Sequence, residues 1–110
     1  MRKIVLDELS STDIRKIKDY LDAVAIPSSI EGLYWVDLTD DLLDGRQCEH
    51  DACKPYRFAI ELLDDSVHLE LLIRSANTMR CSCINYATPQ QREMIFRFGE
   101  RMIDTCGTRT

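Results

Sequence analysis

The stretch Tyr56-Arg57-Phe58-Ala59-Ile60-Glu61-Leu62 and the later stretch Val67-His68-Leu69-Glu70-Leu71-Leu72-Ile73 decide the fold of this 110-residue chain. In both stretches apolar residues occupy every second position, and the positions between them are polar or small except for Leu72, a pattern typical of a β-strand with one buried face. Asp64 and Asp65 lie between them, where a turn is expected. The pattern therefore predicts an antiparallel hairpin with strands over 55–63 and 67–74.

The same alternation predicts the register of this hairpin. If Asp64 and Asp65 form the turn, apolar residues of one strand face apolar residues of the other, as a shared buried face requires. On the outer face this register places Glu61 opposite His68, where an exposed ion pair would contribute less than about 1 kcal/mol. The predicted apolar pairs are Leu62 with Val67, Ile60 with Leu69, Phe58 with Leu71, and Tyr56 with Ile73.

The segment after the hairpin contains two of the five cysteines. Ser75-Ala76-Asn77 fits a three-residue turn, because asparagine tolerates the left-handed backbone conformation. A strand over 79–86 would then direct Cys81 and Cys83 into the core, together with Met79, and leave Arg80 in water. A two-residue turn would expose both thiols instead. The three-residue turn is the favoured interpretation, because it leaves Arg80 in water.

Two amphipathic helices flank these strands. The first is predicted over 11–25, before Pro27, because apolar residues recur at steps of three and four. These residues are Ile14, Ile17, Leu21 and Val24. The second is predicted over 89–105, because Thr88-Pro89-Gln90-Gln91 supplies a hydroxyl cap, a proline at the first helical position and a glutamine at the third.

Two further strands and one loop complete the expected arrangement. Residues 2–7 and 33–38 are expected to form strands, and 45–54 a polar loop that carries cysteines. The resulting fold class is α+β, in the order strand, helix, four strands, helix, for a single domain over 1–110. It consists of an antiparallel β-meander with both amphipathic helices packed on one face of the sheet.

Charge and hydropathy exclude several classes of partner. The chain is acidic, with a formal net charge of −5, so no nucleic-acid partner is expected. No apolar run approaches the ~20 residues that span a bilayer, and the N-terminus lacks the apolar stretch of a signal peptide. We therefore expect no membrane partner and a cytoplasmic location, where thiols stay reduced.

The cysteine-rich composition provides the candidate site. Thiolates and imidazoles are zinc ligands, and two clusters offer five of them. They are Cys48, His50, Cys53, Cys81 and Cys83. There is no paired Cys-x-x-Cys motif, however, and a strand over 79–86 would hold Cys81 away from Cys53. The expected topology therefore argues against convergence on a metal, and no cofactor is assigned, with zinc as the one alternative.

No group of residues matches a catalytic motif. Only His50 and His68 could serve a cysteine nucleophile as a base, and His68 is expected on the outer face of the sheet. A serine triad, a phosphate-binding glycine loop and a metalloprotease helix are all missing from the sequence. The chain is therefore interpreted as a non-enzymatic interaction or binding module. It would bind an unidentified protein partner or self-associate through an exposed strand edge or helix. The alternative is a structural zinc-binding domain that uses both cysteine clusters.

Overall fold

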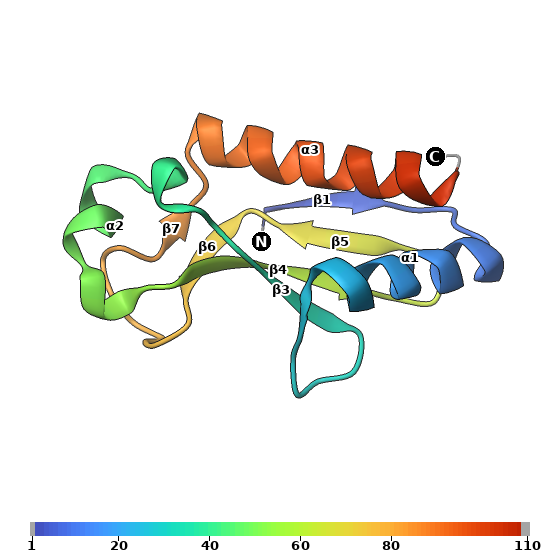
Figure 1. Ribbon diagram of the computed structural model, residues 1–110, viewed down its shortest axis with the longest axis horizontal. Helices are drawn as coiled ribbons and strands as arrows, with labels where there is room; N and C mark the ends of the chain where they lie inside the picture. Colours follow the sequence, from blue (N-terminus) through green and yellow to red (C-terminus); the bar gives the residue numbers. More distant parts are fainter. Residues whose placement is uncertain (1, 109–110) are drawn as a thin grey trace.

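An antiparallel sheet of seven strands and three α-helices make up the computed structural model, which describes residues 2–108 (Figure 1). The α+β class expected from the sequence is confirmed. The strands are β1 (Lys3–Leu6), β2 (Ile26–Pro27), β3 (Leu33–Asp37), β4 (Tyr56–Leu62), β5 (Val67–Glu70), β6 (Leu72–Ser75) and β7 (Asn85–Tyr86). The helices are α1 (Ser11–Val24), α2 (Gly45–Glu49) and α3 (Pro89–Cys106), with 3-10 turns at Asp40–Leu42 and Asp51–Cys53.

The sheet has the order β1-β5-β4-β3-β2, and β4 also pairs with β6, which in turn pairs with β7. The first strand of the chain therefore lies at one edge, beside β5, and the two-residue strand β2 lies at the other. Because β4 pairs with three strands, it forms the centre of the sheet, and three of its side chains are fully buried: Tyr56, Phe58 and Ile60.

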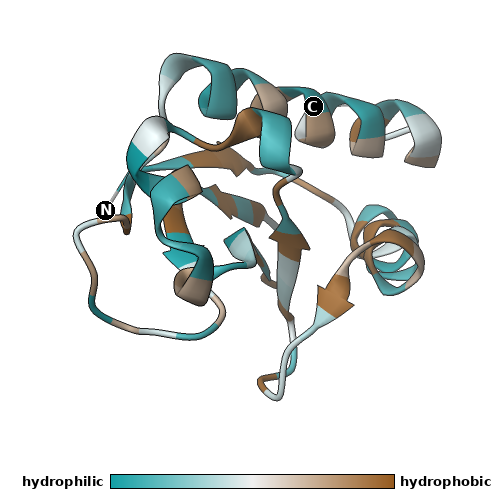
Figure 2. Cartoon of the chain, turned by 60° about the vertical axis from the view of Figure 1, so that its left-hand side comes forward, coloured by the Kyte–Doolittle hydropathy of each residue, from teal (hydrophilic) through white to brown (hydrophobic). Residues whose placement is uncertain are grey.

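Helices α1 and α3 pack against each other and against one face of this sheet. Ile17 and Leu21 of α1 and Ile95 of α3 are fully buried in the same core cluster as β4. The ring of Phe98 stands edge-on to both Tyr20 and Phe58, at centroid distances of 6.3 and 5.9 Å. In Figure 2 both helices alternate between hydrophobic and hydrophilic residues, as amphipathic helices do. Of the helices within residues 2–108, none combines the length and apolarity needed to cross a membrane.

The hairpin register is correct near the turn and wrong beyond it. Leu62 pairs with Val67, Ile60 with Leu69, and Glu61 with His68, as expected. The pairs Phe58–Leu71 and Tyr56–Ile73 do not form, because Tyr56 lies opposite Ser75 instead. The reason lies at Leu71, where the strand breaks into β5 and β6. Its N–H donates to the Arg2 carbonyl at 3.0 Å, and its carbonyl accepts the Ala87 N–H at 2.7 Å.

The expected strand over 79–86 is wrong except for the two residues of β7. Residues 76–84 form a loop with its own internal hydrogen bonds. The Arg80 N–H donates to Thr78 Oγ1 at 3.3 Å, and the Ile84 N–H donates to the Cys81 carbonyl at 3.0 Å. Met79, expected in the core, is 95% exposed at the outside of this loop. The alternation of apolar residues from 79 to 83 resembles a strand but does not form one.

The expected polar loop over 45–54 contains helix α2. The carboxylate of Asp44 accepts the Gln47 N–H at 2.8 Å, and the Gln47 side chain accepts the Asp44 N–H at 3.1 Å. This reciprocal capping box starts a helix at Gly45. The segment between β3 and β4 therefore has a defined backbone, and the candidate ligands within it have defined positions.

Candidate metal centre

Four side chains from two distant segments meet beside α2. They are His50 and Cys53 from the segment before β4, and Cys81 and Cys83 from the loop before β7. One donor atom from each lies within 4.8 Å of all the others. The closest measured approach, His50 Nδ1 to Cys81 Sγ, is 3.0 Å. The expectation that the fold holds Cys81 away from Cys53 was wrong, because residues 76–84 are not a strand.

A 3-10 turn places the first two donors side by side. The Cys53 N–H donates to the His50 carbonyl at 3.0 Å, which closes one turn of this tighter helix. Side chains three residues apart in a 3-10 helix lie on the same side. The His50-x-x-Cys53 spacing therefore presents an imidazole and a thiol in one direction. The hydroxyl of Tyr56 donates to the same His50 carbonyl at 3.2 Å and fixes the turn from the side of β4.

The Cys81-Ser82-Cys83 segment presents the other two donors. The Cys83 N–H points at Cys81 Sγ, at 3.5 Å, so the backbone stabilises negative charge on that sulfur. The side chain of Arg46 in α2 reaches across and donates to the Ser82 carbonyl at 3.2 Å. This contact joins the two ligand segments and places the positively charged guanidinium group of Arg46 beside the Cys81-Ser82-Cys83 segment.

Two polar side chains from the end of β6 fasten the loop to the backbone around Cys53. The Ser75 hydroxyl donates to the Cys53 carbonyl. The Asn77 amide donates to the carbonyls of Ala52, at 3.3 Å, and Lys54. Sequence reasoning assigned Ser75 and Asn77 to a hairpin turn. In the fold they hold the two ligand segments together.

Two buried glutamine side chains connect the site to helices α2 and α3. The Gln47 side-chain amide donates to the Cys83 carbonyl at 3.2 Å, and its oxygen accepts the Gln91 side-chain amide at 2.9 Å. Gln91 also donates to the Leu42 carbonyl at 2.9 Å. Both glutamines are essentially fully buried. Hydrogen bonds therefore connect α2, the start of α3 and the backbone of a candidate ligand.

The pKa values of the Cys81 and Cys83 thiols are shifted in opposite directions by their surroundings. The hydrogen bond from the Cys83 thiol, with the Cys83 backbone N–H and His50 adding to it, lowers the pKa of Cys81 to about 6. Burial, and then the hydrogen bond with Cys81, raises the pKa of Cys83 to about 11. The site therefore favours the thiolate at Cys81 and the protonated thiol at Cys83.

The donor set fits a single zinc ion. Three thiolates and one imidazole make a tetrahedral set of soft and borderline ligands, which selects zinc over calcium or magnesium. Zn–S bonds of about 2.3 Å and Zn–N bonds of about 2.0 Å put the sulfur atoms of a tetrahedral site about 3.8 Å apart and the nitrogen about 3.5 Å from each sulfur. The donors here lie within 4.8 Å of one another, and His50 Nδ1 lies 3.0 Å from Cys81 Sγ, so shifts of about 1 Å or less would complete the geometry.

Cys48, the fifth candidate ligand, lies outside this cluster. Its side chain is exposed on α2, and its sulfur lies 4.0 Å from the Leu43 carbonyl. Cys106, at the end of α3, lies 3.6 Å from the Lys16 carbonyl, and burial raises its pKa. The structure therefore separates four converging donors from two cysteines that take no part in the cluster.

Comparison with known proteins identifies no relative. No protein-family model, curated protein or solved structure gives a significant match to this chain. The site is therefore interpreted from its own geometry.

Proposed function

We propose that this chain is a small structural zinc-binding module, in which His50, Cys53, Cys81 and Cys83 hold one Zn²⁺. The observation that carries the proposal is the approach of four donor atoms to within 4.8 Å of one another. These donors come from segments nearly thirty residues apart, and hydrogen bonds from Ser75, Asn77 and Gln47 support the arrangement.

A structural role is favoured over a catalytic one by the number of protein ligands. Four side chains fill all positions of a tetrahedral zinc ion, whereas catalytic zinc keeps one position for water. In this proposal the protein is an interaction module without enzymatic activity, and the ion supports the shape of its surface.

The ion would link two segments that have little apolar burial of their own. In residues 44–54 the one buried side chain is that of Gln47, and in residues 76–84 it is that of Cys83. Because a site of this kind does not exist in the unfolded chain, the free energy of zinc binding stabilises the folded arrangement of both segments.

Elemental analysis of untagged protein purified in the presence of zinc tests the proposal. About one zinc ion per chain is expected, because the cluster holds a single ion. Cys53→Ser and Cys83→Ser should each lose the ion, since a neutral hydroxyl replaces a thiolate. Cys48→Ser and Cys106→Ser are matched controls, because these thiols lie outside the cluster, and both should keep the ion.

Cobalt provides an independent measurement of the ligand set. Co²⁺ bound in place of zinc should give a thiolate-to-metal charge-transfer absorption that weakens in Cys81→Ser and is unchanged in Cys48→Ser. Wild-type protein that retains no zinc would contradict the proposal, and so would wild-type protein that binds iron instead. So would equal zinc content in Cys83→Ser and wild type.

A further inference from the structure

Strand β1 offers an open edge of the sheet. It pairs with β5 on one side, and within residues 2–108 no strand pairs with its other side. The opposite edge of the sheet differs, because β2 has two residues and one of them is Pro27, which cannot donate a hydrogen bond. Edge strands without such protection pair readily with another chain.

The backbone groups at this open edge belong to odd-numbered residues. In an antiparallel pair, successive residues direct their N–H and C=O groups alternately toward and away from the neighbouring strand. The Arg2 carbonyl accepts the Leu71 N–H at 3.0 Å, so the even-numbered residues face β5. The backbone groups of Lys3 and Val5 are therefore directed outward, in position to pair with a further strand.

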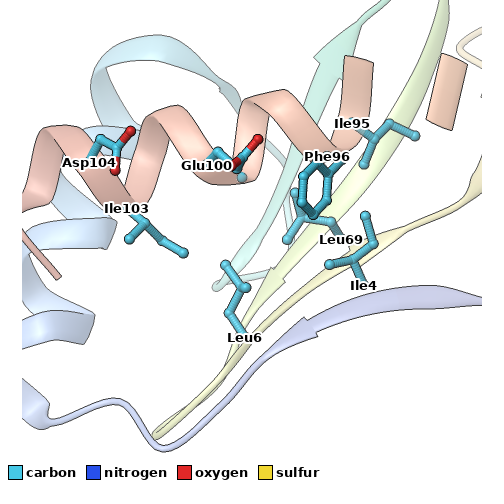
Figure 3. Close-up of a pocket in the computed structure, with 9 residues that line it drawn as sticks. Ile4, Leu6, Leu69, Ile95, Phe96, Glu100, Ile103 and Asp104 are labelled. Atoms are coloured by element: carbon cyan, nitrogen blue, oxygen red, sulfur yellow. The ribbon is translucent and has the colours of Figure 1, made fainter. Parts of the chain in front are cut away.

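Apolar side chains lie on both faces of the same edge. On one face Val5 is 44% exposed. On the other face Ile4 and Leu6 line a groove of about 320 Å³ between β1 and α3, opposite Phe96 and Ile103 (Figure 3). Phe96 is 48% exposed there. A strand added to this edge would therefore cover apolar surface on both faces.

The charges of the edge are complementary to those of an antiparallel copy of the same strand. Lys3 begins β1, and Asp7 follows its last residue, with Val5 midway between them. An antiparallel copy reverses this order, so the cation of each strand meets the anion of the other. This pattern favours a second copy of the chain over an unrelated peptide.

We propose that β1 pairs with β1 of a second copy around a twofold axis at Val5. In this register Val5 lies opposite Val5 of the second copy, Lys3 opposite Asp7, and Ile4 opposite Leu6. The outward backbone groups of the odd-numbered residues then form the hydrogen bonds. The sheets of the two copies then form one continuous sheet. On the face that carries α3, Ile4 and Leu6 of each copy lie beside the same residues of the other.

Other registers lose this match. A slip of one residue would oppose Ile4 to Val5, whose side chains lie on different faces of the sheet. A slip of two residues would oppose Ile4 to Ile4 and Lys3 to Val5, and would leave Lys3 and Asp7 without opposite charges in the second copy. The proposed register alone satisfies the apolar alternation and the charges together.

Sedimentation equilibrium of the full chain over a concentration series tests the proposal. Wild type should follow a reversible monomer–dimer equilibrium. Val5→Lys should weaken the dimer at least tenfold, because it places two like charges opposite each other at the axis. Val24→Lys is the matched control. Val24 is similarly exposed, at 51%, but lies at the end of α1, and the change should leave the equilibrium intact.

Charge exchange tests the register itself. Lys3→Asp and Asp7→Lys should each weaken the homodimer by about tenfold, since each replaces two attractions by two repulsions. A mixture of the two single variants should form a heterodimer, and the double variant K3D/D7K should regain the wild-type homodimer.

Three outcomes would overturn the proposal. The first is a wild-type monomer at every concentration. The second is a dimer that Val5→Lys and the single charge reversals do not weaken, which would show that the copies meet elsewhere. The third is a double variant as weak as the single ones. Zinc content is measured separately, so failure of the dimer would leave the metal proposal untouched.

Discussion

Gln91 links the start of α3 to the segments beside the candidate metal centre. Its side-chain oxygen accepts the Thr88 N–H at 3.0 Å and caps α3. Its amide donates to both Leu42 and Gln47. Both N–H donors and the oxygen of this buried side chain therefore form hydrogen bonds, and burial makes each of these bonds costly to remove.

Gln91→Ala should therefore lower the free energy of unfolding by about 2–3 kcal/mol, since it leaves the Leu42 carbonyl without its partner and opens a cavity. Gln90→Ala, one position earlier and exposed, should change it by less than about 0.5 kcal/mol. Urea unfolding of the zinc-loaded proteins measures both values. Equal stabilities of the two variants would show that the glutamine pair contributes nothing specific.

Single residues also show which contacts the sequence does not predict. The capping role of Gln91 follows from Thr88-Pro89-Gln90-Gln91, but no sequence pattern identifies the partner of its amide, which is 44 residues away. The pattern Asp44-x-x-Gln47 is also a capping box and could have predicted α2. The capping box alone is a weak signal for this helix, because five residues are too few to show an apolar periodicity.

At the scale of elements, Asp22 joins α1 to β3. Its carboxylate accepts hydrogen bonds from Lys18 at 2.8 Å and from the Tyr34 hydroxyl at 2.6 Å. The bond with Lys18, followed by that with Tyr34, lowers the pKa of Asp22. Since the carboxylate is the favoured form in the fold, its stabilisation is present above the unfolded pKa of about 3.9 and is lost as the pH falls through the lower folded value.

Asp22→Asn should therefore be less stable than wild type at pH 7, and this difference should disappear in strong acid. Urea midpoints of the two proteins across an acid pH series measure it, and any loss of zinc affects both alike. Asp19→Asn, on the same helix and without an ion pair among residues 2–108, should show the smaller difference at pH 7. A difference for Asp22→Asn that persists in strong acid would contradict the role of its charge.

The elements that the sequence predicted are those fixed by local pattern. The β4–β5 hairpin follows from strict alternation around Asp64 and Asp65. The register beyond it could not be predicted, because Leu71 and Leu72 are adjacent and either could be buried. The strand break at Leu71 depends on hydrogen bonds to Arg2 and Ala87, which are far away in the sequence.

At the scale of the whole molecule, the two ends of the fold are stabilised by different interactions. The apolar core lies where β4 and β5 meet α1 and α3. The end of the fold that carries the candidate metal centre is instead held by polar contacts, to which the proposed ion would add. Removal of zinc should therefore loosen residues 45–54 and 76–84 while the central strands stay folded.

Hydrogen exchange and limited proteolysis measure this partial loosening. A chelator should speed amide exchange in the two ligand segments and tryptic cleavage at Arg80, whereas amides of β4 and β5 should remain protected. Cys83→Ser should behave in this way without a chelator, and Cys48→Ser should resemble the wild type. Unfolding of the whole sheet on chelation, or no change at Arg80, would contradict this division.

The ligands of the candidate site were visible in the sequence, but their convergence was not. Two cysteine clusters supply the right donor types, yet the distance between them depends on how residues 76–84 fold. Met79, Cys81 and Cys83 alternate as in a strand, whereas contacts of Ser75, Asn77 and Gln47 turn the loop toward Cys53. Such long-range contacts leave no periodic signal in a single sequence.

Helix α3 runs along the sheet above β1 (Figure 1). Gln91, near its start, hydrogen-bonds to Gln47, and Ile103 and Asp104, near its end, line the groove beside β1. Its 18 residues form a rod about 27 Å long, so a tilt of about 5° at one end displaces the other by about 2 Å. A substitution that tilts this helix about its start therefore changes the width of the groove most at Ile103 and least at Ile95. Mutations near Gln91 and near Ile103 should consequently be selected together during evolution.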